Sequence, residues 1–525
     1  MSGLYLAQRV RELARTQPDS LALVDGDQRY TAAEFDALTT SLASGLSRVA
    51  APGDHVGAAV EVGIAGGALF VACAKAGMVF TPVNWRLPAT EIAAIAVDAE
   101  MTVFVADPQF ADAAAAVADA LPQVTVLDTG DELDVFIASG SDADPGLGDD
   151  PQTPILQLYT SGTTGLPKGV LITNHNLHND ADTLTVYRWQ EDSVALGAMP
   201  MFHIAGTGWF CSCVSAGIPL VLLRRFDAQA AAELIETWRV SHIFLVPSTI
   251  QLLLDHLESA DQERDLSSLR LLAYGSAPIT PTLLTRAMTR LRCDFLQRYG
   301  MTETAGSVTA LRAEDHHPNG AGSALLRSVG TPLPGVELAI GDISTGEFLG
   351  PGQTGEILTR SRTNARSYWK RPEATAALYT AEGYLRTGDA GHIDENGYLF
   401  VTDRIKDMII SGGENIYPVE IESVLAEHPS VAEVAVVGVP HEVWGEEVVA
   451  VVRAAPTGPQ IDIDELIDHV AARLGSFKKP RRVFVVDELP RGATGKLLKR
   501  SLRQQFSRPP EVVSVSGAGT GAVRR

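Results

Sequence analysis

Tyr159-Thr-Ser-Gly-Thr-Thr-Gly-Leu-Pro-Lys168-Gly-Val170 is the most informative segment of the chain, because it combines hydroxyl side chains, glycines and a lysine between apolar flanks. Glycines let backbone N–H groups approach an anion closely, and hydroxyl and ammonium groups add further donors. The segment therefore predicts a phosphate-binding loop. The candidate binding residues in it are Thr160, Ser161, Gly162, Thr163, Thr164 and Lys168.

The loop differs from the common nucleotide-binding P-loop. A Walker loop ends in Gly-Lys-Ser/Thr, whereas Lys168 is preceded by Pro167 and followed by Gly169. The segment therefore indicates that the protein handles ATP phosphates, but it disfavours the P-loop NTPase class.

Length, composition and charge limit the class of protein. The chain has 525 residues, of which 45% are hydrophobic and 20% charged, and this predicts a soluble globular protein of two or more domains. It has 42 basic and 64 acidic side chains, a net charge of −22. A surface this acidic argues against nucleic-acid binding and favours local basic sites for anionic ligands.

The cysteines and the hydrophobic runs give no sign of export or membrane insertion. Cys73, Cys211, Cys213 and Cys293 lack the spacing of a zinc site or a disulfide framework, and their apolar neighbours predict reduced, buried thiols. The longest apolar run, Trp209–Leu223, contains Gly217 and Pro219 and predicts buried core elements. We therefore expect a cytoplasmic protein without stable membrane anchoring.

Hydrophobic periodicity predicts a layered α/β fold followed by a small α+β domain. In the first part we expect helices at 4–16 and 32–49 and strands at 21–24, 103–106, 124–127, 243–246 and 269–273. The acidic segment 139–150 is predicted to be a surface connection. In the last part we expect strands at 407–411, 431–438, 447–453 and 482–486, with helices at 418–427 and 462–474.

Several ordered motifs follow the opening loop, and together they resemble the adenylate-forming superfamily, in its acyl-CoA synthetase branch. Any one of them alone would be weak, whereas their order is a strong signal. The resemblance spans roughly residues 10–505. The motifs are Pro200-Met-Phe-His203, Tyr274-Gly-Ser-Ala-Pro278, Tyr299-Gly-Met-Thr-Glu303, Thr387-Gly-Asp389, Asp403-Arg-Ile-Lys-Asp407, Ser411-Gly-Gly-Glu-Asn415 and Gly492-Ala-Thr-Gly-Lys496.

The resemblance implies a two-step reaction. A carboxylate attacks the α-phosphate of MgATP to give an acyl-adenylate and pyrophosphate, and a thiol then displaces AMP. Such a site needs a metal ion, a lysine and backbone donors more than a general base. The resemblance implies that Lys496 bridges the two reacting anions, that Thr302 lies at the phosphate and that Glu303 is the Mg²⁺ ligand.

The resemblance also assigns the nucleotide and acyl contacts. It places Tyr299 beside the adenine, and Asp389 and Arg404 at the ribose. His203 would border the acyl pocket and shift during thioester formation, with further pocket wall from Gly275, Ser276, Ala277, Gly300 and Met301. Each residue has an ordinary alternative: Glu303 as a helix-start carboxylate, Asp389 as a turn residue, Lys496 and Lys168 as solvated lysines, and Tyr299 and His203 as core residues.

The domain boundaries follow from the same resemblance. Residues 1–404 would form the large N-terminal domain, 405–406 the hinge and 407–506 a mobile C-terminal domain, with 507–525 as a disordered tail. Lys406 falls at the pivot, where the small domain would rotate between presenting Lys496 and presenting the face that carries Gly412 and Gly413. The alternative for Lys406 is an exposed linker lysine.

Coenzyme A is the expected thiol acceptor. The basic stretch Gly475–Arg482 suits an anionic nucleotide, and the resemblance assigns Phe477, Lys479 and Arg481 to it, with Trp444 as a further candidate. A solvated charge cluster is the alternative. Since no phosphopantetheine attachment site is visible, free CoA is favoured over a carrier protein.

The sequence therefore predicts an ATP-dependent acyl-CoA synthetase that uses Mg²⁺ and a hydrophobic carboxylic acid, fatty, alicyclic or aryl. An amino-acid substrate is disfavoured, because Phe202-His-Ile-Ala-Gly-Thr-Gly-Trp209 offers only apolar and small groups where an aspartate would hold an ammonium. Two alternatives stay open: an enzyme that loads a carrier protein, and a catalytically silent nucleotide-binding protein. A homodimer is common in such proteins, but the sequence does not decide the oligomeric state.

Overall fold

The computed structural model describes residues 4–160, 167–178, 184–260, 264–412, 414–456, 458–491 and 497–507. By its internal contacts the chain divides into two compact units. Unit 1 comprises residues 1–339, 358–387 and 396–399, and unit 2 comprises residues 340–357, 388–395 and 400–525. The predicted disordered tail lies outside the described residues, except for its first position.

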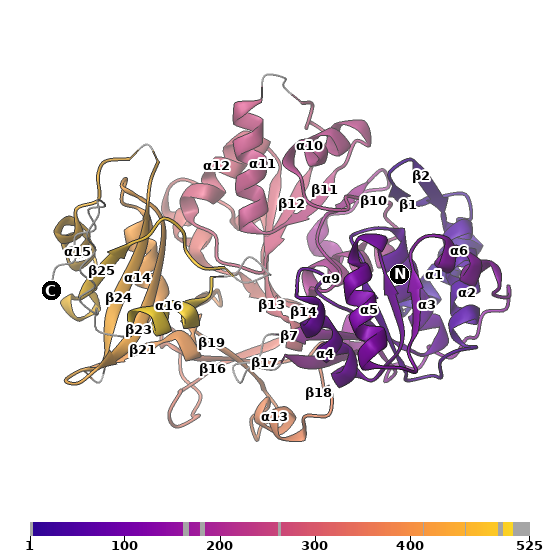
Figure 1. The fold of residues 1–525 in the computed structure, drawn as a ribbon. Coiled ribbons are helices and arrows are strands. Elements are labelled where there is room, and N and C mark those ends of the chain that lie inside the picture. The colour runs from indigo at the N-terminus through magenta and orange to yellow at the C-terminus, as the bar shows by residue number, and fades with distance from the viewer. Residues whose placement is uncertain are drawn as a thin grey trace, which may run out of the picture. The chain divides into compact units, whose positions relative to one another are not determined.

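Unit 1 contains two large sheets (Figure 1). The nine-stranded sheet has the order β15-β14-β13-β12-β11-β9-β10-β1-β2. Its strands are β1 (Leu21–Asp25), β2 (Gln28–Thr31), β9 (Ala195–Gly197), β10 (Leu220–Leu222), β11 (His242–Leu245), β12 (Leu271–Gly275), β13 (Asp294–Met301), β14 (Gly306–Leu311) and β15 (Thr331–Pro332). The seven-stranded sheet has the order β18-β8-β7-β4-β3-β5-β6. Its strands are β3 (His55–Ala59), β4 (Val79–Pro82), β5 (Met101–Ala106), β6 (Thr125–Asp128), β7 (Pro154–Thr160), β8 (Lys168–Thr173) and β18 (Ser367–Tyr368).

Helix α3 (Ile64–Ala76) packs between the two sheets, since it contacts β1 of one and both β4 and β7 of the other. Apart from Lys75 its sequence is apolar on all sides, as expected for a helix buried all round, and every residue from Gly66 to Ala76 is buried. Gly67 allows close packing, because a Cβ there would lie 3.0 Å from the ring of Phe210. The predicted layered α/β class is therefore confirmed.

The remaining helices of unit 1 pack around these sheets, with α11 and α12 side by side next to β11 and β12 (Figure 1). They are α1 (Leu6–Thr16), α2 (Ala32–Leu46), α4 (Ala89–Ala99), α5 (Ala111–Ala120), α6 (Asp131–Ala138), α7 (Asn174–Leu177), α9 (Ile204–Ala216), α10 (Ala228–Thr237), α11 (Pro247–Ser259), α12 (Pro281–Leu291) and α13 (Pro372–Ala377).

A four-stranded sheet of order β16-β17-β19-β20 follows. Its strands are β16 (Glu337–Gly341), β17 (Gly355–Arg360), β19 (Leu385–Ile393) and β20 (Leu399–Arg404).

Unit 2 contains a five-stranded sheet whose two faces are both covered. Along β23 (Val431–His441), Val436 belongs to one apolar cluster, and its neighbours Ala435 and Val437 belong to another. Because strand side chains alternate between faces, each face has its own core. The other elements are β21 (Ile409–Ser411), β22 (Glu414–Ile416), β24 (Gly445–Ala454), β25 (Arg482–Val485), α14 (Pro418–Ala426), α15 (Ile463–Ala471) and α16 (Lys499–Phe506).

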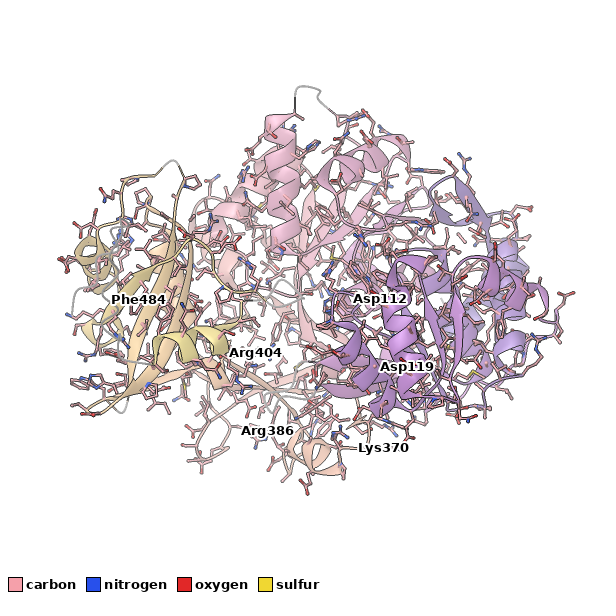
Figure 2. The ribbon with its side chains drawn as sticks, viewed as in Figure 1. Asp112, Asp119, Lys370, Arg386, Arg404 and Phe484 are labelled. Carbon is pink, nitrogen blue, oxygen red and sulfur yellow. The ribbon has the colours of Figure 1, made fainter. Side chains whose placement is uncertain are left out.

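One face of this sheet is covered by α14 and α15, and the other by α16, where Phe506 stacks on Phe484 of β25 with ring centroids 4.3 Å apart (Figure 2). The predicted elements of this part are present, with shifted ends. The strand predicted from 407 begins at Ile409, because Ile405–Asp407 form a turn of 3₁₀ helix. The helix predicted to 474 ends at Ala471. Beyond it, the N–H of Leu474 donates to the carbonyl of Val470.

The cysteine prediction is confirmed in part. All four cysteines are unpaired; Cys73, Cys211 and Cys213 are buried, whereas Cys293 is partly exposed. Within the described ranges, no group of three or more His, Cys, Asp or Glu side chains could hold a metal ion by itself. In the same part of the chain, no helix is long and apolar enough to cross a membrane.

Buried neutral histidines are expected to make unit 1 sensitive to acid. Burial lowers the pKa of His242 and of His316 to about 4. His316 is held as a neutral ring, because Nδ1 donates to the Arg312 carbonyl at 2.7 Å and Nε2 accepts from the Tyr274 hydroxyl at 3.0 Å. As the pH falls below about 6.5, these histidines become protonated in the unfolded chain but stay neutral in the folded chain. The free energy of unfolding therefore decreases between pH 6.5 and pH 4.

Each of these histidines contributes up to about 3 kcal/mol to this loss. The expected result is a melting temperature that falls steadily from pH 7 to pH 4.5, measured by circular dichroism. His316→Gln should flatten that slope relative to the unmodified protein. An unchanged slope would contradict the assignment of His316 as a buried neutral ring.

Candidate active site

The predicted phosphate-binding loop connects two antiparallel strands of the seven-stranded sheet. Thr160 ends β7 and pairs with Lys168, the first residue of β8. Ser161, Gly162, Thr163 and Thr164 lie outside the described residues. The hairpin places Lys168 at one end of the loop, where its Nζ lies 5.1 Å from the centroid of the Tyr368 ring.

Tyr368 connects the loop to Glu303. It belongs to the short edge strand β18, which pairs with β8 so that Tyr368 lies opposite Val170. Its hydroxyl donates to Oε1 of Glu303 at 2.9 Å. Burial and the Glu303 carboxylate raise the pKa of Tyr368 well above its usual range, so the hydroxyl stays a neutral donor.

Glu303 is a buried carboxylate at the end of β13, only 7% exposed. It belongs to a turn of 3₁₀ helix, Thr302–Thr304, and its carbonyl accepts from the N–H of Ala365 at 2.8 Å. Magnesium in nucleotide sites usually takes one or two carboxylates together with phosphate oxygens and water. A single buried, oriented carboxylate therefore fits a magnesium ion that is shared with a bound nucleotide.

The Tyr299–Glu303 motif interrupts the regular strand. The pairing of β13 with β14 shifts register between Tyr299 and Gly300. A Cβ at Gly300 would lie 2.0 Å from the carbonyl oxygen of Gly306, so a side chain there would displace the backbone. After the irregularity the strand continues to Met301, and the turn that carries Thr302 and Glu303 follows directly.

A cavity of about 90 Å³ lies next to this motif in unit 1. Of the predicted pocket residues, Ser276 and Gly300 line it, whereas Gly275, Ala277, Met301 and His203 are not among its lining residues. His203 lies immediately before α9, and the next residues, Ile204 and Ala205, do line the cavity. The other lining residues are Asn176, Leu177, His178, Tyr187, Gly208, Trp209, Ser212, Phe244, Arg298, Ala305, Gly306, Ser307 and Thr363.

Two lining residues adopt a conformation that is rare for residues other than glycine. Ser276 has a φ of +66° and Ala305 a φ of +49°. Left-handed backbone at such residues costs free energy and is frequently found at binding sites. These two positions therefore support the assignment of the cavity as a binding site.

Two glycines of α9 provide a test of the cavity wall. Gly208 lines the cavity and has open space where a Cβ would be, whereas a Cβ at Gly206 would lie 2.2 Å from the carbonyl oxygen of Pro200. Gly208→Ala is expected to lower kcat/KM for the largest accepted acids about tenfold without lowering the melting temperature. Gly206→Ala should cost about 1–3 kcal/mol of stability. An identical response of the two variants in thermal melts and pyrophosphate-release assays would contradict the cavity assignment.

In unit 2, Asp389 and Arg404 form the predicted ribose-binding pair. Asp389 is 4% exposed, and its Oδ1 lies 2.7 Å from Nε of Arg404. Arg404, labelled in Figure 2, is the last residue of β20. Gly388, which precedes Asp389, has a φ of +69° and donates its N–H to Oε1 of Glu356 at 3.3 Å. The turn thus orients the carboxylate that the sequence singled out.

The predicted hinge residue Lys406 lies in a turn of 3₁₀ helix, Ile405–Asp407. The carbonyls of Lys406 and Asp407 accept from the guanidinium of Arg503 on α16, at 3.5 and 3.2 Å. The backbone of this turn is therefore tied to the C-terminal helix. The pivot role of Lys406 and the predicted domain boundary stay predictions.

Two of the residues predicted to bind CoA, Trp444 and Arg481, form one stack in unit 2, next to Gly412. The guanidinium of Arg481 lies 4.4 Å from the centroid of the Trp444 ring, and a Cβ at Gly412 would lie 3.0 Å from the same ring. The N–H of Gly412 donates to the Trp444 carbonyl at 2.8 Å. Phe477 and Lys479 are exposed in and just after the turn Ser476–Lys478. Gly413 and Lys496 lie outside the described residues.

Two residues near the site were missed by the sequence analysis. Tyr368 lies outside every motif, although an aromatic group in the polar stretch Arg366-Ser-Tyr368 is a weak signal. Arg298 immediately precedes Tyr299, lines the cavity and is only 8% exposed. A basic residue inside an apolar strand next to a binding motif is the signal that could have found it.

Residues 10–369 match the AMP-binding enzyme family, and residues 420–496 match the AMP-binding enzyme C-terminal domain. The chain belongs to the AMP-binding enzyme family and is a ligase of the adenylate-forming superfamily.

Relatives of known activity cover nearly the whole chain. It is 36% identical over 508 residues to a fatty acid–[acyl-carrier-protein] ligase of Streptomyces coeruleorubidus, covering 95% of this chain and 96% of the relative. It is 35% identical over 507 residues to a long-chain-fatty-acid–CoA ligase of Mycobacterium tuberculosis, covering 95% and 98%. The crystal structure of ATP-bound MatB from Rhodopseudomonas palustris superimposes with a TM-score of 0.85 at 31% identity, covering 95% and 99%.

Proposed function

We propose that the protein is an AMP-forming acyl-CoA synthetase. The observation that carries the proposal is the meeting of Lys168, Tyr368 and Glu303, which come from separate segments of the chain. This cluster combines a cation for phosphates with an oriented carboxylate for Mg²⁺. The ATP-bound neighbour and the CoA-ligase relatives support ATP and CoA as co-substrates.

In the first step, a carboxylate oxygen of the acid forms a bond to the α-phosphorus of ATP, and the bond from that phosphorus to pyrophosphate breaks. Bound Mg²⁺ neutralises charge on the phosphates. Lys168 and the loop 160–168 would hold the departing pyrophosphate, and Glu303 would hold the metal ion. Asp389 would accept the ribose hydroxyls, with Arg404 beside it, while Tyr299 would contact the adenine and Lys496 would bridge the two anions.

In the second step, the thiolate of CoA forms a bond to the acyl carbon, and the bond from that carbon to AMP breaks. The stack of Gly412, Trp444 and Arg481 would bind the CoA nucleotide. Trp444 is 39% exposed and Phe477 is 48% exposed, so both rings are accessible to a ligand. A stacked aromatic and a cation beside it suit a purine nucleotide.

Trp444→Ala tests this assignment. We expect the KM for CoA to rise roughly tenfold to 100-fold, because stacking on one base is worth about 1–3 kcal/mol. The burst of pyrophosphate released without CoA should be unchanged. Phe348→Ala, which removes another exposed aromatic of unit 2, is the matched control. Equal CoA kinetics in the two variants would refute the role of Trp444.

A carrier protein is the second candidate acceptor, favoured by the similarity to the acyl-carrier-protein ligase. The two acceptors are compared by supplying CoA or a phosphopantetheinylated carrier protein at equal concentration and measuring AMP release. Faster release with CoA is the expected result. Release only with the carrier protein would replace the CoA proposal.

A homodimer and a cytoplasmic location stay predictions.

A further inference from the structure

Arg298 is a buried arginine whose charge lacks a partner in the described part of unit 1. It lies on β13, is 8% exposed and lines the cavity next to the Tyr299–Glu303 motif. Its Nε and Nη1 are buried, and neither has a hydrogen-bond acceptor among the described residues. Burying an unpaired guanidinium is costly, so such a group is expected to have an anionic partner in the functional state.

The carboxylate at the start of the same strand is engaged elsewhere. Asp294 pairs with Nη1 of Arg188 at 2.7 Å, and Glu314 pairs with Nη2 of the same arginine at 2.5 Å. Arg298 instead contacts the ring of Tyr187, with its Cζ 5.1 Å from the ring centroid. A cation over an aromatic face is stabilised, but it keeps its unused N–H donors.

The cavity around Arg298 is built for an anion. Among the described residues that line it, none is an Asp or a Glu, and five carry a hydroxyl group: Tyr187, Ser212, Ser276, Ser307 and Thr363. The described lining also includes the apolar side chains of Ile204, Trp209 and Phe244. A ligand that fits both kinds of lining residue has a short hydrocarbon body and an anionic end.

We propose that this cavity selects acids that carry a second carboxylate, so that the protein activates a short dicarboxylic acid, an inference that rests on the proposed acyl-CoA synthetase function. One carboxylate reacts with ATP, and the other binds Arg298. A guanidinium suits a carboxylate in both charge and hydrogen-bonding geometry. The volume of about 90 Å³ is small, which favours a body of a few carbon atoms.

This assignment adds a charge to the apolar pocket that the sequence predicted. The lining residues from α9 are small or apolar, apart from Ser212, whereas β13 contributes the cationic Arg298. A fatty acid would leave the guanidinium unpaired in the complex, whereas a dicarboxylic acid would pair it. Arg298 is therefore the residue expected to make the cavity select a dicarboxylic acid over a fatty acid.

The test compares matched acids: succinate and glutarate, their monoamides, and butyrate and valerate. Pyrophosphate release is measured with the unmodified protein and with Arg298→Gln, Arg298→Lys and Arg188→Gln. The unmodified protein is expected to prefer a dicarboxylate over the monocarboxylate of equal length by at least about 100-fold, because the latter leaves a buried donor unpaired. The monoamides should lie between them.

The variants separate binding of the second carboxylate from a structural role. Arg298→Gln should abolish the preference for dicarboxylates over monocarboxylates, and Arg298→Lys should restore part of it. Arg188→Gln, which removes an exposed arginine that pairs with β13, should keep the preference. Succinate or glutarate should raise the melting temperature of the unmodified protein but not that of Arg298→Gln.

Each further outcome overturns a specific claim. Equal use of mono- and dicarboxylates by the unmodified protein would refute the inference while leaving the synthetase function intact. A large fall in the melting temperature of Arg298→Gln with unchanged selectivity would show that an internal group pairs with the guanidinium. Absence of pyrophosphate release with every carboxylic acid, including fatty and aryl acids, would refute the proposed function itself.

Discussion

Glu303→Gln is expected to lower kcat/KM for pyrophosphate release at least about 1000-fold, because it removes the negative charge that would hold Mg²⁺ at the phosphates. The shape of the site should be kept, since the Tyr368 hydroxyl, 2.9 Å from Oε1 of Glu303, can donate equally to an amide oxygen. The loss should therefore come from metal binding rather than from unfolding. Initial rates across a magnesium titration, together with a thermal melt, measure both quantities.

Two companion variants make this test specific. Glu314→Gln removes an exposed glutamate that pairs with Arg188 and is expected to keep full activity. Tyr368→Phe keeps the carboxylate but removes its donor, and it should lower the rate only about tenfold, in line with one lost charge-assisted hydrogen bond. Near-normal activity of Glu303→Gln at low magnesium would exclude Glu303 as the metal ligand.

Asp389→Asn is expected to raise the KM for ATP roughly 100-fold. The carboxylate would accept hydrogen bonds from ribose hydroxyls, and hydrogen bonds to a charged group contribute about 1.5–3 kcal/mol each. Stability should change little, because the side chain of Arg404, the ion-pair partner, is 44% exposed and can be hydrated when the charge is lost. ATP titrations at saturating acid and CoA provide the measurement.

The control for this prediction is Asp487→Asn, which removes an exposed carboxylate from the same unit. It is expected to leave the KM for ATP unchanged. The KM for the acid should also stay constant in Asp389→Asn, since this residue is assigned to the ribose and not to the acyl pocket. A variant that changes the KM of the acid and of ATP equally would show a general distortion instead.

The helices and strands of unit 2 were largely predictable, because their signals are local. Alternation of apolar residues identified β23 and β24, and Pro418 marked the first turn of α14. The errors lie at ends, such as the start of β21 and the end of α15, where hydrogen bonds of a turn compete with the regular pattern. In unit 1, α3 shows the limit of periodicity, since a helix buried on all sides has no polar face to detect.

The site was predicted where a motif is contiguous, and was missed where a contact depends on the pairing of distant segments. Glu303 and Asp389 each belong to a contiguous motif, and in the structure both are buried carboxylates. Tyr368 reaches Glu303 across 65 residues of chain, only because β18 pairs with β8. No local pattern encodes that pairing.

By itself, the sequence determined the family, the order of the motifs and the side chains available for two anions and a metal ion, because these depend on residue type and short spacing. Only the tertiary structure decided that Lys168, Tyr368 and Glu303 form one cluster, that Arg481 stacks on Trp444, and that Arg298 lines a cavity whose described lining includes no carboxylate. Burial and pairing are properties of the packed sheets and helices. The same arginine would be an ordinary surface charge if β13 lay at an exposed edge.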